Sequence, residues 1–140
     1  MSFIHATATS TFRSGTGQFI AGKITPAVRA GVEAFGNLVL QEAQAIVPVD
    51  TGELRDSGSV TVEEGDKRVV AHVVFSAPHA AFVEFGTGQR GAGSPGAGPY
   101  SYSPTWPGMA AQPYLRPALD TAREAGKELF RSQVAAAFQF

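Results

Sequence analysis

Apolar residues recur every three or four positions between residues 25 and 47, which is the spacing of an amphipathic helix. Thr25 can cap the start of this helix, and Pro26 is tolerated in its first turn because an N–H there has no partner inside the helix. Pro48 ends the helix. The stripe that we expect to face the core consists of Val28, Val32, Phe35, Val39, Ala43 and Ile46.

The pattern then changes to alternation, which predicts an antiparallel hairpin. Residues 59–64 place Val60 and Val62 on one face, and residues 64–67 are turn-forming. The second strand, residues 68–75, is apolar on parts of both faces. We therefore expect it to lie centrally in its sheet, or to present one face to another subunit.

A second amphipathic helix is predicted from Pro113 onward, with the charged residues largely off its apolar face. That face consists of Leu115, Leu119, Ala122, Gly126, Leu129 and Val134. The order helix, hairpin, loop and helix predicts an α+β fold, in which two long amphipathic helices pack on a small antiparallel β-sheet. We place this single domain at residues 25–140.

Two segments lack a sustained hydrophobic period. Residues 1–24 are rich in Ser, Thr, Gly and Ala, and we interpret them as an N-terminal arm, either a frayed terminus or a segment that folds onto a neighbouring subunit. Residues 86–112 form a long loop dense in Gly and Pro, and such loops are usually functional or disordered. Aromatic residues in both segments are candidate interface residues: Phe12, Phe19, Tyr100, Tyr102 and Trp106.

The composition indicates a protein with partners. Only 16% of the residues are charged, against roughly 25% in an ordinary domain, so we expect other molecules to cover part of the surface. The formal net charge is -1 and the basic residues are scattered, which gives no general attraction to nucleic-acid phosphates. The chain has no cysteine and no apolar run long enough for a membrane span.

The short motifs of the chain predict no catalytic, metal or cofactor site. Gly86, Gly88 and Gly91 have the spacing of a dinucleotide-binding loop, but the residues that follow cannot form the helix that would hold a pyrophosphate. Gly86 and Gly88 are better interpreted as backbone positions with positive φ. His79 and Glu84 could form an acid–base pair, but no nucleophile or oxyanion donor accompanies them.

Residues 50–55 (DTGELR) have the pattern of a helix cap. The Asp50 carboxylate can accept hydrogen bonds from the N–H groups of a short helical turn, while Glu53, three residues later, reaches back. Leu54 is then the side chain that we expect to point inward.

Arg116 stands at the start of the second long helix, where a cation opposes the helix dipole. We therefore expect the guanidinium to have a carboxylate partner, and the candidates are Asp50, Glu53 and Glu84. The alternative is an exposed arginine without a partner.

Three stretches occur in a fixed order, at residues 47–55 (VPVDTGELR), 82–88 (FVEFGTG) and 112–119 (QPYLRPAL). Together with the flanking helices they resemble the tail-component, or neck-protein, family of long-tailed bacteriophages and prophages, over roughly residues 27–135. The residues that carry the resemblance are Asp50, Thr51, Gly52, Leu54, Arg55, Glu84, Phe85, Gly86, Gly88, Pro113, Leu115, Arg116 and Pro117. The resemblance implies an α+β fold, assembly into a ring, no cofactor and no catalytic residue.

On this resemblance we expect a structural virion protein of the head-to-tail interface, a neck or tail-completion protein that is not an enzyme. It would form a homo-oligomeric ring, through which DNA passes without sequence-specific binding. Its neighbours would be a connector or head-closure protein and a tail terminator or tail tube protein. It would be assembled in the host bacterial cytoplasm, away from any membrane. The alternative is a tail-terminator ring that caps the tail tube.

Overall fold

The computed structural model describes residues 4–11, 18–65, 68–87 and 105–137. Three strands form one antiparallel sheet in the order β1-β3-β2: β1 (Ile4–Thr11), β2 (Gly58–Glu64) and β3 (Arg68–Phe75). Thr7 of β1 and Thr61 of β2 both pair with His72, and the two outer strands run level with each other on either side of β3. The hairpin and the central position of β3 confirm the sequence prediction.

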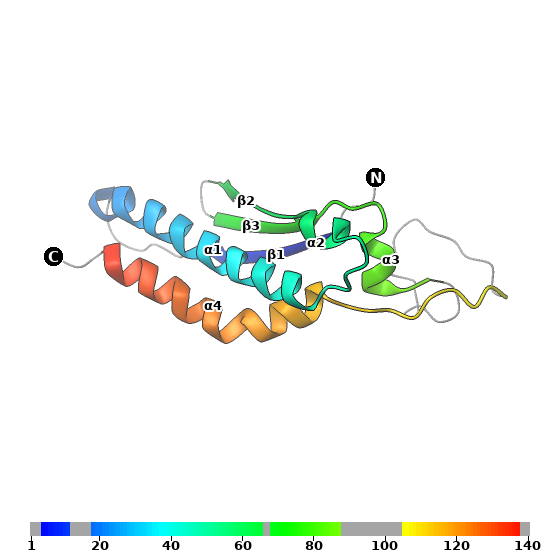
Figure 1. Cartoon of the computed structure of the whole chain (residues 1–140). Coiled ribbons are helices and arrows are strands. Elements are labelled where there is room, and N and C mark those ends of the chain that lie inside the picture. The colour runs from blue at the N-terminus through cyan, green and yellow to red at the C-terminus, as the bar shows by residue number, and fades with distance from the viewer. Residues whose placement is uncertain (1–3, 12–17, 66–67, 88–104, 138–140) are drawn as a thin grey trace.

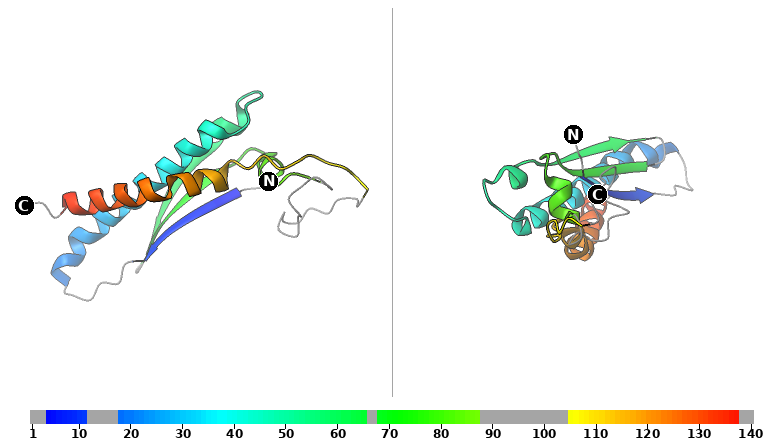
Figure 2. Two further views of the ribbon diagram at one scale, coloured as in Figure 1. Left: turned by 90° about the horizontal axis from the view of Figure 1, so that it is seen from below. Right: turned by 90° about the vertical axis from the view of Figure 1, so that its right-hand side faces the viewer.

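Two long helices cover one face of this sheet, and this confirms the predicted α+β class. Helix α1 (Gln18–Ile46) lies across β2 and β3, and α4 (Leu115–Ala137) runs alongside α1 in the opposite direction and contacts β1 (Figures 1 and 2). Two short helices, α2 (Glu53–Asp56) and α3 (Ala80–Phe85), lie at the end of the molecule where α1 stops and α4 begins (Figure 1). None of the helices in the described ranges has the length and hydrophobicity that a membrane crossing requires.

The core follows the alternation of β3. Its inward positions are Val69, Ala71, Val73 and Phe75, and all four are buried. On the helix side, the predicted stripe of α1 is buried at Val28, Val32, Val39 and Ala43. The apolar face that the sequence predicted for α1 is therefore the face that packs on the sheet.

Two positions of the predicted stripes are wrong. Ile46 is 48% exposed and Leu129 is 38% exposed. Near these positions the buried row advances in steps of four, from Ala43 in α1 to Val47 just after its end, and in α4 through Ala122 and Gly126 toward Phe130. Ile46 and Leu129 each stand one residue before that row, a rotation of about 100° away from it.

The N-terminal region differs from the expected arm. Residues 4–11 form β1, which pairs with β3 of the same chain, and α1 begins at Gln18 instead of Thr25. Pro26 therefore lies inside α1, where it removes one N–H donor without ending the helix. The small Ala and Thr side chains of β1 gave no alternation of bulky apolar residues, so only the pairing with β3 defines this strand. Phe12 lies outside the described residues, and Phe19 belongs to α1.

The two long helices approach each other through a reciprocal pair of glycines and phenylalanines. A Cβ atom at Gly31 would stand 2.6 Å from the Phe130 ring, and a Cβ atom at Gly126 would stand 2.6 Å from the Phe35 ring. Each ring thus occupies the space that a side chain on the opposite helix would need. Gly31 and Phe35 are four residues apart on α1, and Gly126 and Phe130 are four residues apart on α4, so each pair lies on one face of its helix. The two contacts therefore form one continuous line between the helices, which we call the seam.

Candidate functional site

The three sequence stretches that carried the family resemblance meet at one end of the molecule. The first stretch follows directly after α1 and includes most of α2, the second includes the end of α3, and the third includes the start of α4 (Figure 1). Leu54, Tyr114 and Leu115 are buried in one hydrophobic cluster with Phe75 and Ala80. This end, from α2 to the first turn of α4, is the candidate site.

The centre of the site is a buried carboxylate. Glu84 is only 5% exposed, and its two carboxylate oxygens accept hydrogen bonds from three successive backbone N–H groups at the start of α4. The donor–acceptor distances are 2.8 Å to Tyr114, 2.9 Å to Leu115 and 3.2 Å to Arg116. These are N–H groups that a helix cannot satisfy itself, and the positive end of the helix dipole also favours the negative charge. We call this set of contacts the Glu84 clamp.

Tyr114 fixes the same junction from the side of α4. Its side chain is fully buried, and its hydroxyl donates a hydrogen bond to the Ala80 carbonyl oxygen at 3.3 Å. Its ring packs edge-on against the Phe75 ring, with the two ring centroids 4.9 Å apart. Burial, and secondarily the nearby charge of Glu84, raises the pKa of the Tyr114 phenol well above its ordinary value. The phenol is therefore neutral at physiological pH and acts as a structural group.

The ends of the long loop are joined next to the clamp. The Thr87 N–H donates to the Met109 carbonyl oxygen at 2.8 Å, and the Met109 N–H donates back to the Thr87 carbonyl oxygen and to Thr87 Oγ1. The Gln112 N–H also donates to the Val83 carbonyl oxygen at 2.8 Å. The loop thus leaves the body through a closed base. Gly86 at this base has φ 72°, as predicted, whereas Gly88 lies outside the described residues.

The capping acceptor predicted at residues 50–55, the Asp50 carboxylate, is wrong, whereas the inward position of Leu54 is confirmed. Gly52, with φ 86°, occupies the N-cap position of α2, and no side chain caps this helix. Thr51 Oγ1 accepts a hydrogen bond from the Glu53 N–H at 3.3 Å, while the Asp50 side chain is exposed. A left-handed backbone at Gly52 turns the chain away from Asp50, which explains the difference. Leu54 is buried, as expected.

Arg55 links α2 to its neighbours without entering the core. Its guanidinium pairs with Asp56 at 2.9 Å, and this contact lowers the pKa of the Asp56 carboxyl. Its carbonyl oxygen accepts a hydrogen bond from Gln44 of α1 at 3.1 Å. Because both side chains of the ion pair are exposed, the pair adds little stability.

Arg116 lacks the carboxylate partner that we expected for its guanidinium. Glu84 does reach this residue, but it accepts a hydrogen bond from the backbone N–H, and the Arg116 side chain is exposed and forms no ion pair with any described residue. The helix dipole is thus balanced by Glu84 directly.

Exposed apolar side chains are concentrated at this end. Four of the large hydrophobic residues that are exposed within the described ranges belong to it: Ile46, Val49, Trp106 and Met109. Trp106, predicted as an interface residue, is 46% exposed, whereas Tyr100 and Tyr102 lie outside the described residues. Val49 and Met109 were not identified from the sequence, because a single apolar residue in a loop carries no periodic signal.

The described residues bear on two chemistries that the sequence raised, a metal site and a His79–Glu84 pair. Among these residues, no group of three or more His, Asp or Glu side chains could hold a metal ion. Neither an acid–base pair nor a structural pair of His79 with Glu84 forms among the described residues; both oxygens of the Glu84 carboxylate accept hydrogen bonds from the start of α4 instead. The clamp is therefore an element of structure.

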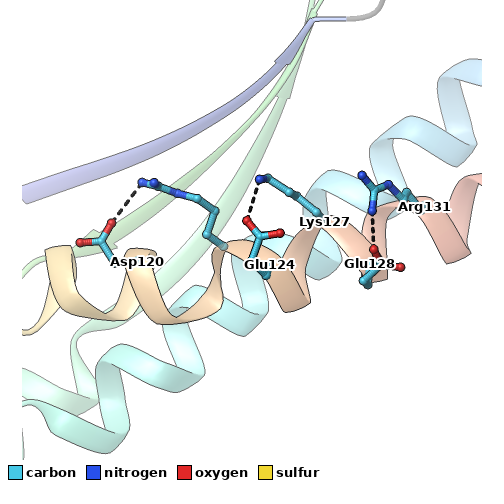
Figure 3. Close-up of polar contacts among 6 residues, drawn as sticks. Asp120, Glu124, Lys127, Glu128 and Arg131 are labelled. Atoms are coloured by element: carbon cyan, nitrogen blue, oxygen red, sulfur yellow. Dashed lines mark hydrogen bonds and ion pairs between the residues drawn. The ribbon is translucent and has the colours of Figure 1, made fainter.

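The outward face of α4 is charged but balanced. Three acid–base pairs recur every four residues, and the partners within each pair are three residues apart: Asp120 with Arg123, Glu124 with Lys127, and Glu128 with Arg131 (Figure 3). The hydrogen bond from Lys127 lowers the pKa of the Glu124 carboxyl. These exposed pairs contribute little stability, and within each pair the two charges cancel.

Comparisons with known proteins agree with the resemblance over part of the chain. Residues 18–86 match the HK97-gp10-like family model, which is described as "Bacteriophage HK97-gp10, putative tail-component". The match runs from the start of α1 through α3, so it includes the first stretch and most of the second, and it ends before the third. No curated protein and no solved structure matches the chain.

Proposed function

The chain belongs to the HK97-gp10-like family of bacteriophage tail components, and from this premise we propose that it works at the junction between phage head and tail, as a neck or tail-completion protein. As a tail component it is a structural part of the virion and contacts other virion proteins. Membership in a structural family also implies a role without catalysis.

The observation that carries the proposal is the closed base of the long loop. The Glu84 clamp and the Thr87–Met109 pairing hold both ends of the loop against the body, while Trp106 and Met109 remain exposed beside them. A rigid body that presents apolar side chains from a firmly held loop is suited to binding a partner protein.

In this proposal several copies form a ring between the head-side connector, or head-closure protein, and the tail terminator or tail tube. The DNA passes through the centre of the ring without sequence-specific binding. The formal net charge of -1 and the paired charges on α4 support this, because neither would hold the phosphate backbone.

The test is a phage that carries Leu115→Asp or lacks the gene. Leu115 is buried in the cluster under the clamp, so an unpaired carboxylate there should cost several kcal/mol, about 3 or more, and should remove the folded subunit. We expect electron microscopy of the lysate to show filled heads apart from finished tails. Ser132→Asp, on the exposed part of α4, is the matched control and should give normal virions.

The outcomes separate the candidate roles. Normal joined virions from the Leu115→Asp phage would contradict a role at the junction. Tails of uncontrolled length would instead indicate the alternative role, a terminator ring that caps the tail tube. An absence of heads from the lysate would indicate a role in capsid assembly instead.

A further inference from the structure

The outer edge of β2 has no strand beside it. In the order β1-β3-β2, β2 pairs only with β3 within the described residues, and it lies on the side of the sheet away from α4 (Figures 1 and 2). The other outer strand, β1, has both long helices against it. Both outer strands therefore leave one edge without a strand among the described residues, and the β2 edge is the one farther from α4.

This edge lacks the features that keep edge strands apart. Natural sheets protect their edges with lysine, proline or a bulge, because unpaired N–H and C=O groups accept any other strand. Residues Gly58–Glu64 contain no lysine, arginine or proline, and their register against β3 runs without interruption. The two acidic residues near the end of the strand already have partners in the same chain: Glu64 pairs with Arg29 at 2.8 Å, and Glu63 lies 3.0 Å from His72 Nε2.

The edge is also incompletely covered on its apolar side. Val60 and Val62 point toward the core, yet both remain only partly buried, whereas Val69, Ala71 and Val73 on the neighbouring β3 are buried. A further strand beside β2 would cover the two valines and satisfy the outward backbone groups together.

We infer that the outer edge of β2 is a docking site for the β2 strand of a second copy of this chain, paired antiparallel about a two-fold axis at Thr61. The strand is complementary to itself in this register. Val60 lies opposite Val62 of the second copy, Thr61 opposite Thr61, and Ser59 opposite Glu63, whose carboxylate can accept the serine hydroxyl. No two like charges face each other.

The alternative arrangement within copies of this chain, β2 beside β1 of the next copy, is less favourable. Both strands are antiparallel to β3, so a sheet that continued from β2 to β1 would require a parallel joint, which is weaker per residue. Helix α4 also contacts β1, whereas β2 lies on the side of the sheet away from α4. A two-fold joint adds one copy and then stops, so it goes beyond the proposed function and is separate from the contacts of the proposed ring.

The natural absence of cysteine allows a direct test by disulfide trapping in the full chain. Thr61→Cys places two thiols opposite each other across the two-fold axis, within the range of Cα separations that a disulfide tolerates. We expect mild oxidation to convert most of this variant into a covalent dimer. Ser132→Cys, exposed on α4, is the matched control and should remain mostly monomeric. Equal cross-linking of the two variants would overturn the inference.

A mixture of two variants tests the register. Ser59→Cys and Glu63→Cys should cross-link to each other much more than either does to itself. Self-linking of Ser59→Cys alone would indicate another register and would contradict the axis at Thr61. Cross-links between Thr61→Cys and Thr7→Cys in place of Thr61 dimers would indicate the β2–β1 joint and would also overturn the proposal, since both residues are level with His72.

A second test does not depend on disulfide formation. The substitution Thr61→Lys places on the β2 edge the lysine that natural edge strands use against pairing. Light scattering should show a dimer for the unmodified chain and a monomer for Thr61→Lys, with the same circular dichroism spectrum for both. A monomeric unmodified chain would contradict the inference and leave the role at the head-to-tail junction unaffected. Conversely, normal virions from the Leu115→Asp phage would remove the proposed role and leave the dimer intact.

Discussion

Glu84 caps a helix that begins 31 positions later in the chain. Its carboxylate accepts hydrogen bonds from the first three N–H groups at the start of α4, a task that a Ser, Thr or Asp next to the helix usually performs. Here the cap also connects two segments that lie on either side of the long loop. The same side chain therefore stabilises α4 and holds the base of the loop.

Glu84→Ala should lower the free energy of unfolding by about 2–4 kcal/mol, because it leaves three backbone donors without an acceptor in a buried place. Glu84→Gln keeps one acceptor oxygen and should cost less. Urea unfolding would measure both, with Glu53→Ala, an exposed acidic residue of α2, as the control. A loss for Glu84→Ala no larger than that of the control would show that the clamp contributes nothing.

Tyr114 should make stability depend on alkaline pH. Its raised pKa means that folding favours the neutral phenol, so its contribution is complete below the ordinary pKa of 10.0 and is lost as the pH rises above it. At neutral pH, Tyr114→Phe should cost about 1 kcal/mol for the lost bond to Ala80. Thermal unfolding should then show that the difference in melting temperature between the unmodified chain and Tyr114→Phe becomes smaller from neutral pH to pH 11. A constant gap would contradict the buried, neutral phenol.

At the scale of elements, the packing of α1 against α4 depends on glycines that a propensity scale would count as weaknesses. Gly31 and Gly126 reduce helix propensity by about 1 kcal/mol each relative to alanine. They are retained in a tightly packed seam because Phe130 and Phe35 fill the space above them. The close approach of the two helices thus requires both the small residue and the large one.

Gly126→Ala should destabilise the protein by about 1–3 kcal/mol, because the added methyl group overlaps the Phe35 ring and more than offsets the gain in helix propensity. In a Phe35→Ala background the same substitution should become neutral or stabilising by up to about 1 kcal/mol. Denaturant unfolding of the unmodified chain, the two single variants and the double variant gives the coupling free energy between Gly126 and Phe35. If Gly126→Ala has the same effect in both backgrounds, the two residues do not form the seam.

At the scale of the whole molecule, the long loop should be dispensable for folding and required for joining. The contacts that close its base involve Val83, Thr87, Met109 and Gln112, all outside residues 88–104. Replacing residues 88–104 with a Gly/Ser linker of about six residues should leave the unfolding midpoint almost unchanged. The corresponding phage should accumulate separate heads and tails in electron micrographs. Normal joining by this variant would remove the loop from the proposed interface.

The sequence by itself determined the class of fold and most of the core. Periods of two and of three to four residues reflect the geometry of a strand and a helix, so the hairpin, the two long helices and most of their buried faces could be predicted without a structure. The three stretches that resemble the phage family could also be recognised from the sequence without a structure. The interface character of Phe12, Phe19, Tyr100, Tyr102 and Trp106 stays a prediction.

Only the tertiary structure decided how distant residues pair. Residues 4–11 become a strand because β3 offers them an edge, Glu84 becomes a cap because α3 lies beside the start of α4, and Gly126 meets Phe35 because the two helices cross at that turn. None of these contacts has a local signal, since each partner is more than 30 positions away along the chain and hydrogen bonds and close packing depend on distance in space. The unpaired outer edge of β2 follows from the same cause: a sequence pattern indicates a strand, and only the assembled sheet shows which strands lie at its edges.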